Sequence, residues 1–182
     1  MKRVFDLLAS AVGLLILAVP LAVLAWQVRR KLGSPVLFTQ VRPGLHGKPF
    51  RMVKFRTMTD ERDASGALLP DAQRLTPFGR FLRSSSLDEL PELWNVLKGD
   101  MSLVGPRPVV QAELGRYGDE VVYYFMVKPG MTGLWQVSGR NDVDYETRVY
   151  FDAWYVKNWS LWADVAILFK TISVVTKKRG AY

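Results

Sequence analysis

Two adjacent carboxylates, Asp88 and Glu89, lie in the middle of the sequence, just before a stretch that predicts a helix. The amide groups of a helix's first turn have no partner within the helix, so they can hold a phosphate beside such a carboxylate. Aspartate is a covalent nucleophile in phosphoryl transfer, and a neighbouring carboxylate can bind Mg²⁺. This pair therefore suits phosphoryl chemistry, with Asp88 attacking and Glu89 holding Mg²⁺.

The same residues also fit a purely structural role. Ser86 and Glu89 have the spacing of a capping box, and Asp88 stands where a helix N-terminus favours negative charge. Alternatively Asp88 itself caps the helix, with Pro91 in the first turn. Spacing alone favours capping over catalysis.

Basic residues in two further motifs flank the carboxylates. Lys54 and Arg56 are two positions apart, which places them on one face if the segment is a strand. Arg107 stands between Pro106 and a second proline, in a rigid turn suited to a fixed phosphate contact, and we expect Pro106 and Arg107 both to contact the substrate. Taken singly, each basic residue is better explained as a solvated surface group or as the partner of a carboxylate.

Composition narrows the chemistry further. The 182 residues include no cysteine and a single histidine, His46, which excludes disulfides, thiolate sites and multi-histidine zinc sites. The net charge of +8 predicts an anionic partner such as nucleic acid, anionic lipid or nucleotide phosphates. Length alone favours one domain.

The N-terminal segment predicts contact with a membrane. No charged residue occurs from Leu7 to Trp26, and a helix of that length covers about 30 Å, roughly one hydrocarbon thickness. Basic residues flank the run on both sides (Lys2, Arg3 and 29–31), although positive charge prefers the cytoplasmic side. Pro20 favours a kink. We expect a re-entrant helix that bends near Pro20 and returns to the cytoplasmic face, with a spanning helix as the alternative.

The rest of the chain predicts an α+β, mostly helical fold. Residues 35–58 predict a short β-hairpin, and 59–71 a surface loop. Helices are expected from Thr76, over 90–97 with a stop at Gly99, and over 113–125. The aromatic and basic tail, 145–178, predicts interfacial amphipathic helices. Residues 1–32 are thus expected to form the membrane helix, and 33–182 a catalytic domain on the cytoplasmic face.

Several sequence blocks resemble the bacterial monotopic phosphoglycosyl transferases. They follow one another in the family's order and cover nearly the whole chain. The blocks are FTQVRPG (38–44), KFRTM (54–58), SLDELP (86–91), LKGDMS (97–102), VGPRP (104–108) and KPGMTGLWQVSGR (128–140).

This resemblance implies a two-step reaction. In the family, the aspartate matching Asp88 attacks the β-phosphate of a UDP-sugar, UMP leaves, and polyprenyl phosphate attacks the phosphosugar-aspartyl intermediate. The residue matching Glu89 helps to bind Mg²⁺, and those matching Lys54, Arg83 and Arg107 line the phosphate and nucleotide region. One departure is Val19, since a small hydroxylated residue often precedes the family's helix-breaking proline.

The C-terminal blocks narrow the resemblance to a minimal hexose-1-phosphate transferase that starts O-antigen or exopolysaccharide synthesis. These blocks are VDYETR (143–148), WYVKNW (154–159) and GAY (180–182). The resemblance implies UDP-galactose or UDP-glucose as donor, undecaprenyl phosphate as acceptor, the bacterial inner membrane as location, no nucleic-acid partner and a possible homo-oligomer. The alternatives are a non-catalytic basic protein bound to a membrane surface, and direct transfer by a polytopic-type enzyme, which the single apolar segment disfavours.

Overall fold

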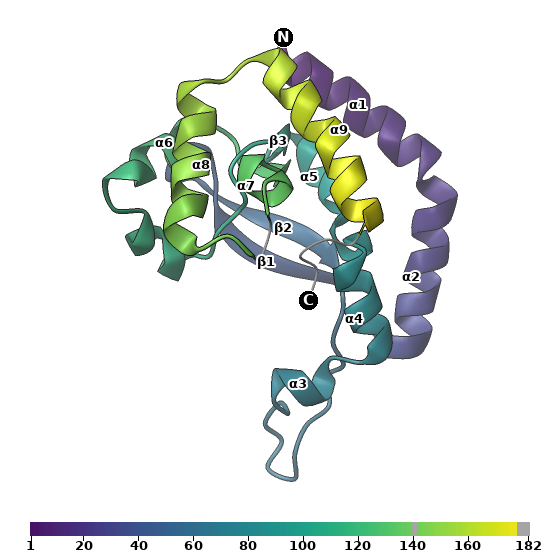
Figure 1. Ribbon diagram of the computed structural model, residues 1–182. Helices are drawn as coiled ribbons and strands as arrows, with labels where there is room; N and C mark the ends of the chain where they lie inside the picture. Colours follow the sequence, from purple (N-terminus) through teal and green to yellow (C-terminus); the bar gives the residue numbers. More distant parts are fainter. Residues whose placement is uncertain (140–141, 178–182) are drawn as a thin grey trace.

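The computed structural model describes residues 1–139 and 142–177, and it confirms a mostly helical α+β fold (Figure 1). Arg140 and the final 180–182 block therefore lie outside the described residues. The elements are α1 (Lys2–Ile16), α2 (Ala18–Leu32), β1 (Leu37–Pro43), η1 (Leu45–Gly47), β2 (Pro49–Phe55), α3 (Asp71–Arg74), α4 (Pro77–Ser84), η2 (Leu87–Glu89), α5 (Glu92–Lys98), β3 (Ser102–Val104), η3 (Gln111–Glu120), α6 (Val121–Met126), β4 (Gly130–Thr132), α7 (Leu134–Val137), α8 (Tyr145–Lys157) and α9 (Leu161–Lys177).

The apolar N-terminal segment forms two helices instead of one kinked helix. α1 and α2 meet at Leu17 with a bend of 64°. The bend expected near Pro20 is therefore present, three residues before the proline. Proline cannot donate to a carbonyl one turn earlier and its ring crowds that carbonyl, so the break falls upstream and Pro20 lies in the first turn of α2. Within the described chain no single helix has the length and hydropathy to cross a membrane, whereas the bent pair together has both.

The predicted hairpin, the helix start at Thr76 and the helix stop at Gly99 are present. β1 and β2 pair antiparallel from Leu37 opposite Phe55 to Pro43 opposite Pro49. α4 begins after Thr76, whose side-chain oxygen accepts the Gly79 amide at 3.1 Å. α5 ends at Gly99 in the left-handed conformation that glycine adopts without strain. The helix expected over 113–125 is divided into η3, with non-helical Gly118, and α6.

A short parallel pair, β3 with β4, was not predicted. Ser102 lies opposite Gly130, and Val104 opposite Thr132. A β-carbon at Gly130 would lie 2.1 Å from the backbone nitrogen of Gly105, so these backbones can cross only with glycine there. The crossing fixes the start of the turn that carries Arg107.

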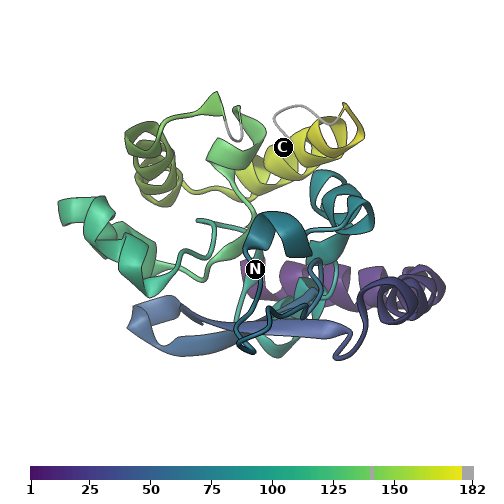
Figure 2. The same cartoon turned by 90° about the horizontal axis from the view of Figure 1, so that it is seen from below.

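The aromatic tail forms α8 and α9, which divide their aromatic residues between core and surface. Tyr155 is buried in a cluster with Val104 and Ile167, whereas Trp162 and Phe169 are 83% and 70% exposed. Seen from below, α8 and α9 lie on one side of the molecule, with the hairpin and the N-terminal helices on the other (Figure 2).

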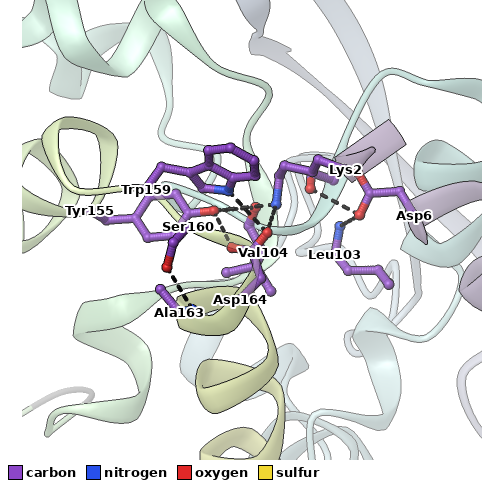
Figure 3. Close-up of polar contacts among 10 residues, drawn as sticks. Lys2, Asp6, Leu103, Val104, Tyr155, Trp159, Ser160, Ala163 and Asp164 are labelled. Atoms are coloured by element: carbon purple, nitrogen blue, oxygen red, sulfur yellow. Dashed lines mark hydrogen bonds and ion pairs between the residues drawn. The ribbon is translucent and has the colours of Figure 1, made fainter. Parts of the chain in front are cut away.

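A buried polar cluster joins the start of α1 to the α8–α9 connection (Figure 3). Lys2 Nζ lies 2.5 Å from Asp164 Oδ2, and the Tyr155 hydroxyl donates to Asp164 Oδ1 at 2.6 Å. Farther along α1, Asp6 Oδ1 accepts the Leu103 amide of β3 at 3.0 Å. The end of α2 contacts the same body, since Leu32 packs with Phe55 and Leu82. Both ends of the helix pair are therefore fixed to the part of the protein that carries Asp88.

Candidate active site

Asp88 lies in the short helix η2, which begins immediately after Ser86. Ser86 has φ of 56°, a left-handed conformation that is uncommon for residues other than glycine and that often occurs at functional sites. Its side chain does not cap η2, and Pro91 precedes α5 with no side-chain cap either. Both capping interpretations were therefore wrong. The turn instead directs the Asp88 carboxylate into a cavity while leaving it only 8% exposed.

Two cations hold Glu89 in place. Its Oε1 atom lies 2.7 Å from Lys54 Nζ of β2 and 2.7 Å from Arg107 Nη2 of the turn after β3. Lys54 also lies 3.2 Å from Oε1 of Glu92, which is 2% exposed. The structure thus joins Glu89, one of the two predicted carboxylates, to two of the predicted basic residues in one network. Charge-assisted hydrogen bonds of this length are among the stronger ones in proteins.

The network separates the pKa values of its carboxyl groups. Burial and the neighbouring Glu89 charge raise the pKa of Asp88 to about 6. Burial would also raise the pKa of Glu89, but the charges and hydrogen bonds of Arg107 and Lys54 outweigh it and lower that pKa to about 2. Burial and the Glu89 charge raise the pKa of Glu92. At neutral pH the site therefore has a permanently ionised Glu89 beside a largely ionised Asp88.

The carboxylates face a cavity of ≈ 820 Å³, which is within the size range of small-molecule sites. Arg83 lines it and donates from Nε to the Thr57 hydroxyl at 3.0 Å. Arg56 also lines it, but its Nη2 is paired with Asp60 at 2.8 Å. Among the residues that the structure describes, seven basic side chains line this cavity: Arg42, Lys54, Arg56, Arg74, Arg83, Arg107 and Arg148.

Pro106 has a different role from the one predicted. It is fully buried and does not line the cavity, so we correct its assignment as a substrate contact. Its carbonyl accepts the Gly130 amide at 2.8 Å, which ties the Arg107 turn to β4. Pro106 therefore positions Arg107. Pro20 lies in α2 and is not among the residues that line the cavity.

Sequence reasoning missed Arg42, Glu92 and Asn95. Arg42 lies on the same face of the hairpin as Lys54, and the alternation applied to Lys54 and Arg56 could have found it. Burial, and then the like charge of Arg107, lower the pKa of Arg42. Asn95 is completely buried, and its side chain accepts the Val53 amide and donates to the Arg51 carbonyl. It supports β2 next to Lys54, which no local pattern reveals.

The donor set fits a Mg²⁺ ion that shares its ligands with a substrate. Within 1–139 and 142–177 no group of three or more acidic or histidine side chains is arranged to hold a metal. Magnesium in phosphoryl-transfer sites needs only one or two protein carboxylates, because phosphate oxygens and water complete its shell. Glu89 and Asp88 offer such oxygens at the cavity wall.

Comparisons with known proteins identify the family. The family model described as bacterial sugar transferase matches residues 1–178. The chain belongs to the bacterial sugar transferase family. This confirms the family expected from the sequence blocks.

Individual sugar transferases are also similar over nearly the whole chain. An undecaprenyl-phosphate galactose phosphotransferase of Salmonella typhimurium is 54% identical over 100% of this chain and 42% of its own length. The sugar transferase EpsL of Bacillus subtilis is 52% identical over 99% of this chain and 89% of its own. A UDP-glucose:undecaprenyl-phosphate glucose-1-phosphate transferase of Klebsiella pneumoniae is 39% identical over 100% of this chain and 41% of its own length. The chain thus spans about two fifths of the Salmonella and Klebsiella relatives.

Proposed function

We propose that this protein transfers a sugar-1-phosphate from a UDP-sugar to undecaprenyl phosphate, with Asp88 as the nucleophile. The observation that carries the proposal is the buried Asp88 carboxylate, which faces a cavity lined by basic residues beside the Lys54–Glu89–Arg107 network. The names of the relatives support the reaction class. A non-catalytic surface-binding protein would have no use for a buried carboxylate beside paired cations.

In the first step, an Asp88 oxygen attacks the β-phosphorus of the donor. The new phosphorus–oxygen bond forms as the bond to the bridging oxygen breaks, and UMP leaves with that electron pair. Arg107 and Arg42 lie where they can bind the diphosphate oxygens, and neutralising that charge lets an anionic nucleophile approach. In the second step, an oxygen of the lipid phosphate attacks the same phosphorus and releases the Asp88 carboxylate.

The pKa of Asp88, about 6, suits both steps. The carboxylate is mostly ionised at neutral pH, as an attacking group must be. Burial leaves it poorly solvated, which favours attack over remaining as a free anion. Glu89, with Asp88 beside it, would hold Mg²⁺, which when bound supplies positive charge to the diphosphate.

The N-terminal helices support a location of this chemistry at a bilayer. Both ends of the α1–α2 pair contact the catalytic part, and large apolar side chains near the bend are exposed, including Leu15 at 79% and Val19 at 73%. Exposed apolar surface of this kind is typical of membrane contact. These features support a re-entrant pair in the inner membrane with the active site on the cytoplasmic face, and α9 lying at the interface.

The donor is proposed to be UDP-galactose or UDP-glucose. The Salmonella relative is named for galactose and the Klebsiella relative for UDP-glucose. The product would start O-antigen or exopolysaccharide synthesis, and a relative from Rhizobium meliloti is named as an exopolysaccharide production protein.

A transfer assay tests the proposal. Purified protein in detergent receives Mg²⁺, undecaprenyl phosphate and each of several UDP-sugars, and the lipid-linked sugar diphosphate and UMP are both measured. We expect both products from one donor, and a loss of at least a thousandfold in Asp88→Asn. Asp71→Asn, an exposed carboxylate at the rim of the same cavity, is the matched control and should retain activity. Full activity in Asp88→Asn would overturn the assignment.

A further inference from the structure

We infer that a second, apolar cavity behind Glu89 binds the first isoprene units of the lipid acceptor. This inference rests on the proposed function, and it assigns the part of the site that receives the second substrate. The cavity has a volume of ≈ 280 Å³, slightly below the roughly 300–1,000 Å³ of sites that enclose a whole small molecule. It therefore suits one portion of a larger ligand.

The two cavities meet at the reacting centre. Ser86, Glu89 and Gln136 line both of them, so the apolar cavity opens within one residue of Asp88. The large cavity has basic walls that suit phosphates. A ligand that carries a phosphate joined to a hydrocarbon chain would match this change from charged to apolar surface.

The walls of the second cavity offer a hydrocarbon chain almost exclusively apolar contacts. One wall is the face of α9 that carries Leu168, Val174 and Val175, and the opposite wall comes from η2 and the strand pair. Two of the polar side chains here, Thr132 and Thr171, share a hydrogen bond of 2.8 Å. The apolar wall residues are Leu87, Leu90, Leu103, Met131, Val137, Leu168, Val174 and Val175.

One polar atom at the junction has no partner among residues 1–139 and 142–177. The Gln136 Oε1 atom is buried and accepts no hydrogen bond from these residues, although Nε2 of the same amide donates to the Met131 carbonyl at 3.3 Å. Such an orphaned acceptor is costly unless a ligand pairs with it. Gln136 lines both cavities. A hydroxyl of the phosphosugar on Asp88 could therefore donate to Gln136 Oε1 while the prenyl chain occupies the apolar cavity.

The position of α9 gives the remainder of the chain a way out to the membrane. Its opposite face carries Trp162 and Phe169, and Ile172 lies at the edge between the two faces; all three side chains are strongly exposed. The acceptor's head would thus reach Asp88 past the inner face of α9, while its tail continues into the lipid that contacts the outer face. This arrangement explains why α9 is apolar on both faces.

Photo-crosslinking tests the assignment directly. A farnesyl phosphate with a diazirine in its second isoprene unit is irradiated with the full chain in nanodiscs, and labelled peptides are mapped by mass spectrometry. We expect labelling within 168–175 or 87–90, reduced by undecaprenyl phosphate and not by phosphatidylglycerol. Labelling confined to α1 and α2, or equal competition by phosphatidylglycerol, would overturn the assignment.

A kinetic comparison adds a second readout. Val174→Trp fills the cavity, so the KM for undecaprenyl phosphate should rise at least tenfold. Ile172→Trp places the same side chain at an exposed position of α9 and should keep the wild-type KM. Equal KM values in the two variants would contradict the cavity's role. If the wild-type chain forms no lipid product, the proposed function fails instead, and the crosslinking pattern still reports what occupies the cavity.

Discussion

At the scale of single residues, the site depends on carboxyl groups whose environments differ. Asp88 and Glu89 are neighbours in sequence, yet only Glu89 is ion-paired with both Lys54 and Arg107. This difference places their pKa values at about 6 and about 2. The residue with the higher value is a potential nucleophile, and the residue with the lower value is a fixed negative charge for a metal or for the cations.

We expect the rate of UMP release without lipid acceptor to fall as the pH falls through about 6. Only the ionised Asp88 attacks, and at pH 5 about a tenth of this group would be ionised, given its raised pKa. Glu89 stays ionised throughout this range, so it does not contribute to the pH dependence of the rate. Single-turnover UMP release from pH 5 to 8 measures the effect. A rate independent of pH would contradict it.

Glu92→Gln is the control for this pH profile. Burial and the charge of Glu89 raise the pKa of Glu92, so it could titrate nearby. If the acid side of the profile belongs to Asp88, it should persist in this variant.

At the scale of elements, β2 is supported on one edge by β1 and on the other by a side chain. Asn95 of α5 accepts the Val53 amide at 3.0 Å and donates to the Arg51 carbonyl at 2.7 Å. Its amide thus replaces a third strand beside Lys54. This contact fixes the distance between the hairpin and the helix that follows Asp88.

Asn95→Ala should lower the free energy of unfolding by about 2–4 kcal/mol, because it removes a fully buried side chain and leaves a partly buried N–H and a partly buried C=O without this partner. Urea unfolding in mild detergent provides the measurement. Lys98→Ala, on the exposed side of the same helix, should change stability by no more than about 0.5 kcal/mol. If both variants unfold at the same urea concentration, the bridging role of Asn95 is wrong.

The elements also show what the sequence could and could not reveal. The hairpin, the helix start at Thr76 and the stop at Gly99 depend on local residue types, and all were predicted. Lys54, Asp88, Glu89 and Arg107 were also identified, because they stand in motifs. The β3–β4 pair and the role of Asn95 depend on contacts between segments that are distant in sequence. The pattern of residues within one segment does not indicate such contacts.

At the scale of the whole molecule, the N-terminal helices are fixed at both ends to the catalytic part. Lys2 reaches Asp164, and Arg3 donates to the Val96 and Leu97 carbonyls at the end of α5. At the other end, Arg56 donates to the Leu32 carbonyl at 3.4 Å. A helix that crossed the bilayer would place its ends about 30 Å apart, on opposite sides of the membrane. Because one body of the protein contacts both ends of the α1–α2 pair, the contacts favour a pair that enters and leaves the bilayer on the same side.

Cysteine labelling tests this topology, and the natural chain has no cysteine to interfere. Val4→Cys lies in the first turn of α1 and Ser34→Cys lies just after α2, and both positions are exposed. A membrane-impermeant maleimide should label both in inverted vesicles and neither in sealed, right-side-out ones. Val19→Cys, at the bend, should resist labelling from either side. Labelling of Val4→Cys and Ser34→Cys from opposite sides would show a spanning helix.

The central claim is that Asp88 carries the phosphosugar, and intact mass tests it most directly. Purified protein in detergent is mixed with Mg²⁺ and either UDP-galactose or UDP-glucose, without lipid acceptor. The account predicts a mass increase equal to one phosphosugar for one donor, absent in Asp88→Asn and lost when undecaprenyl phosphate is added. An unmodified mass, together with UMP release that requires undecaprenyl phosphate, would contradict it and indicate direct transfer.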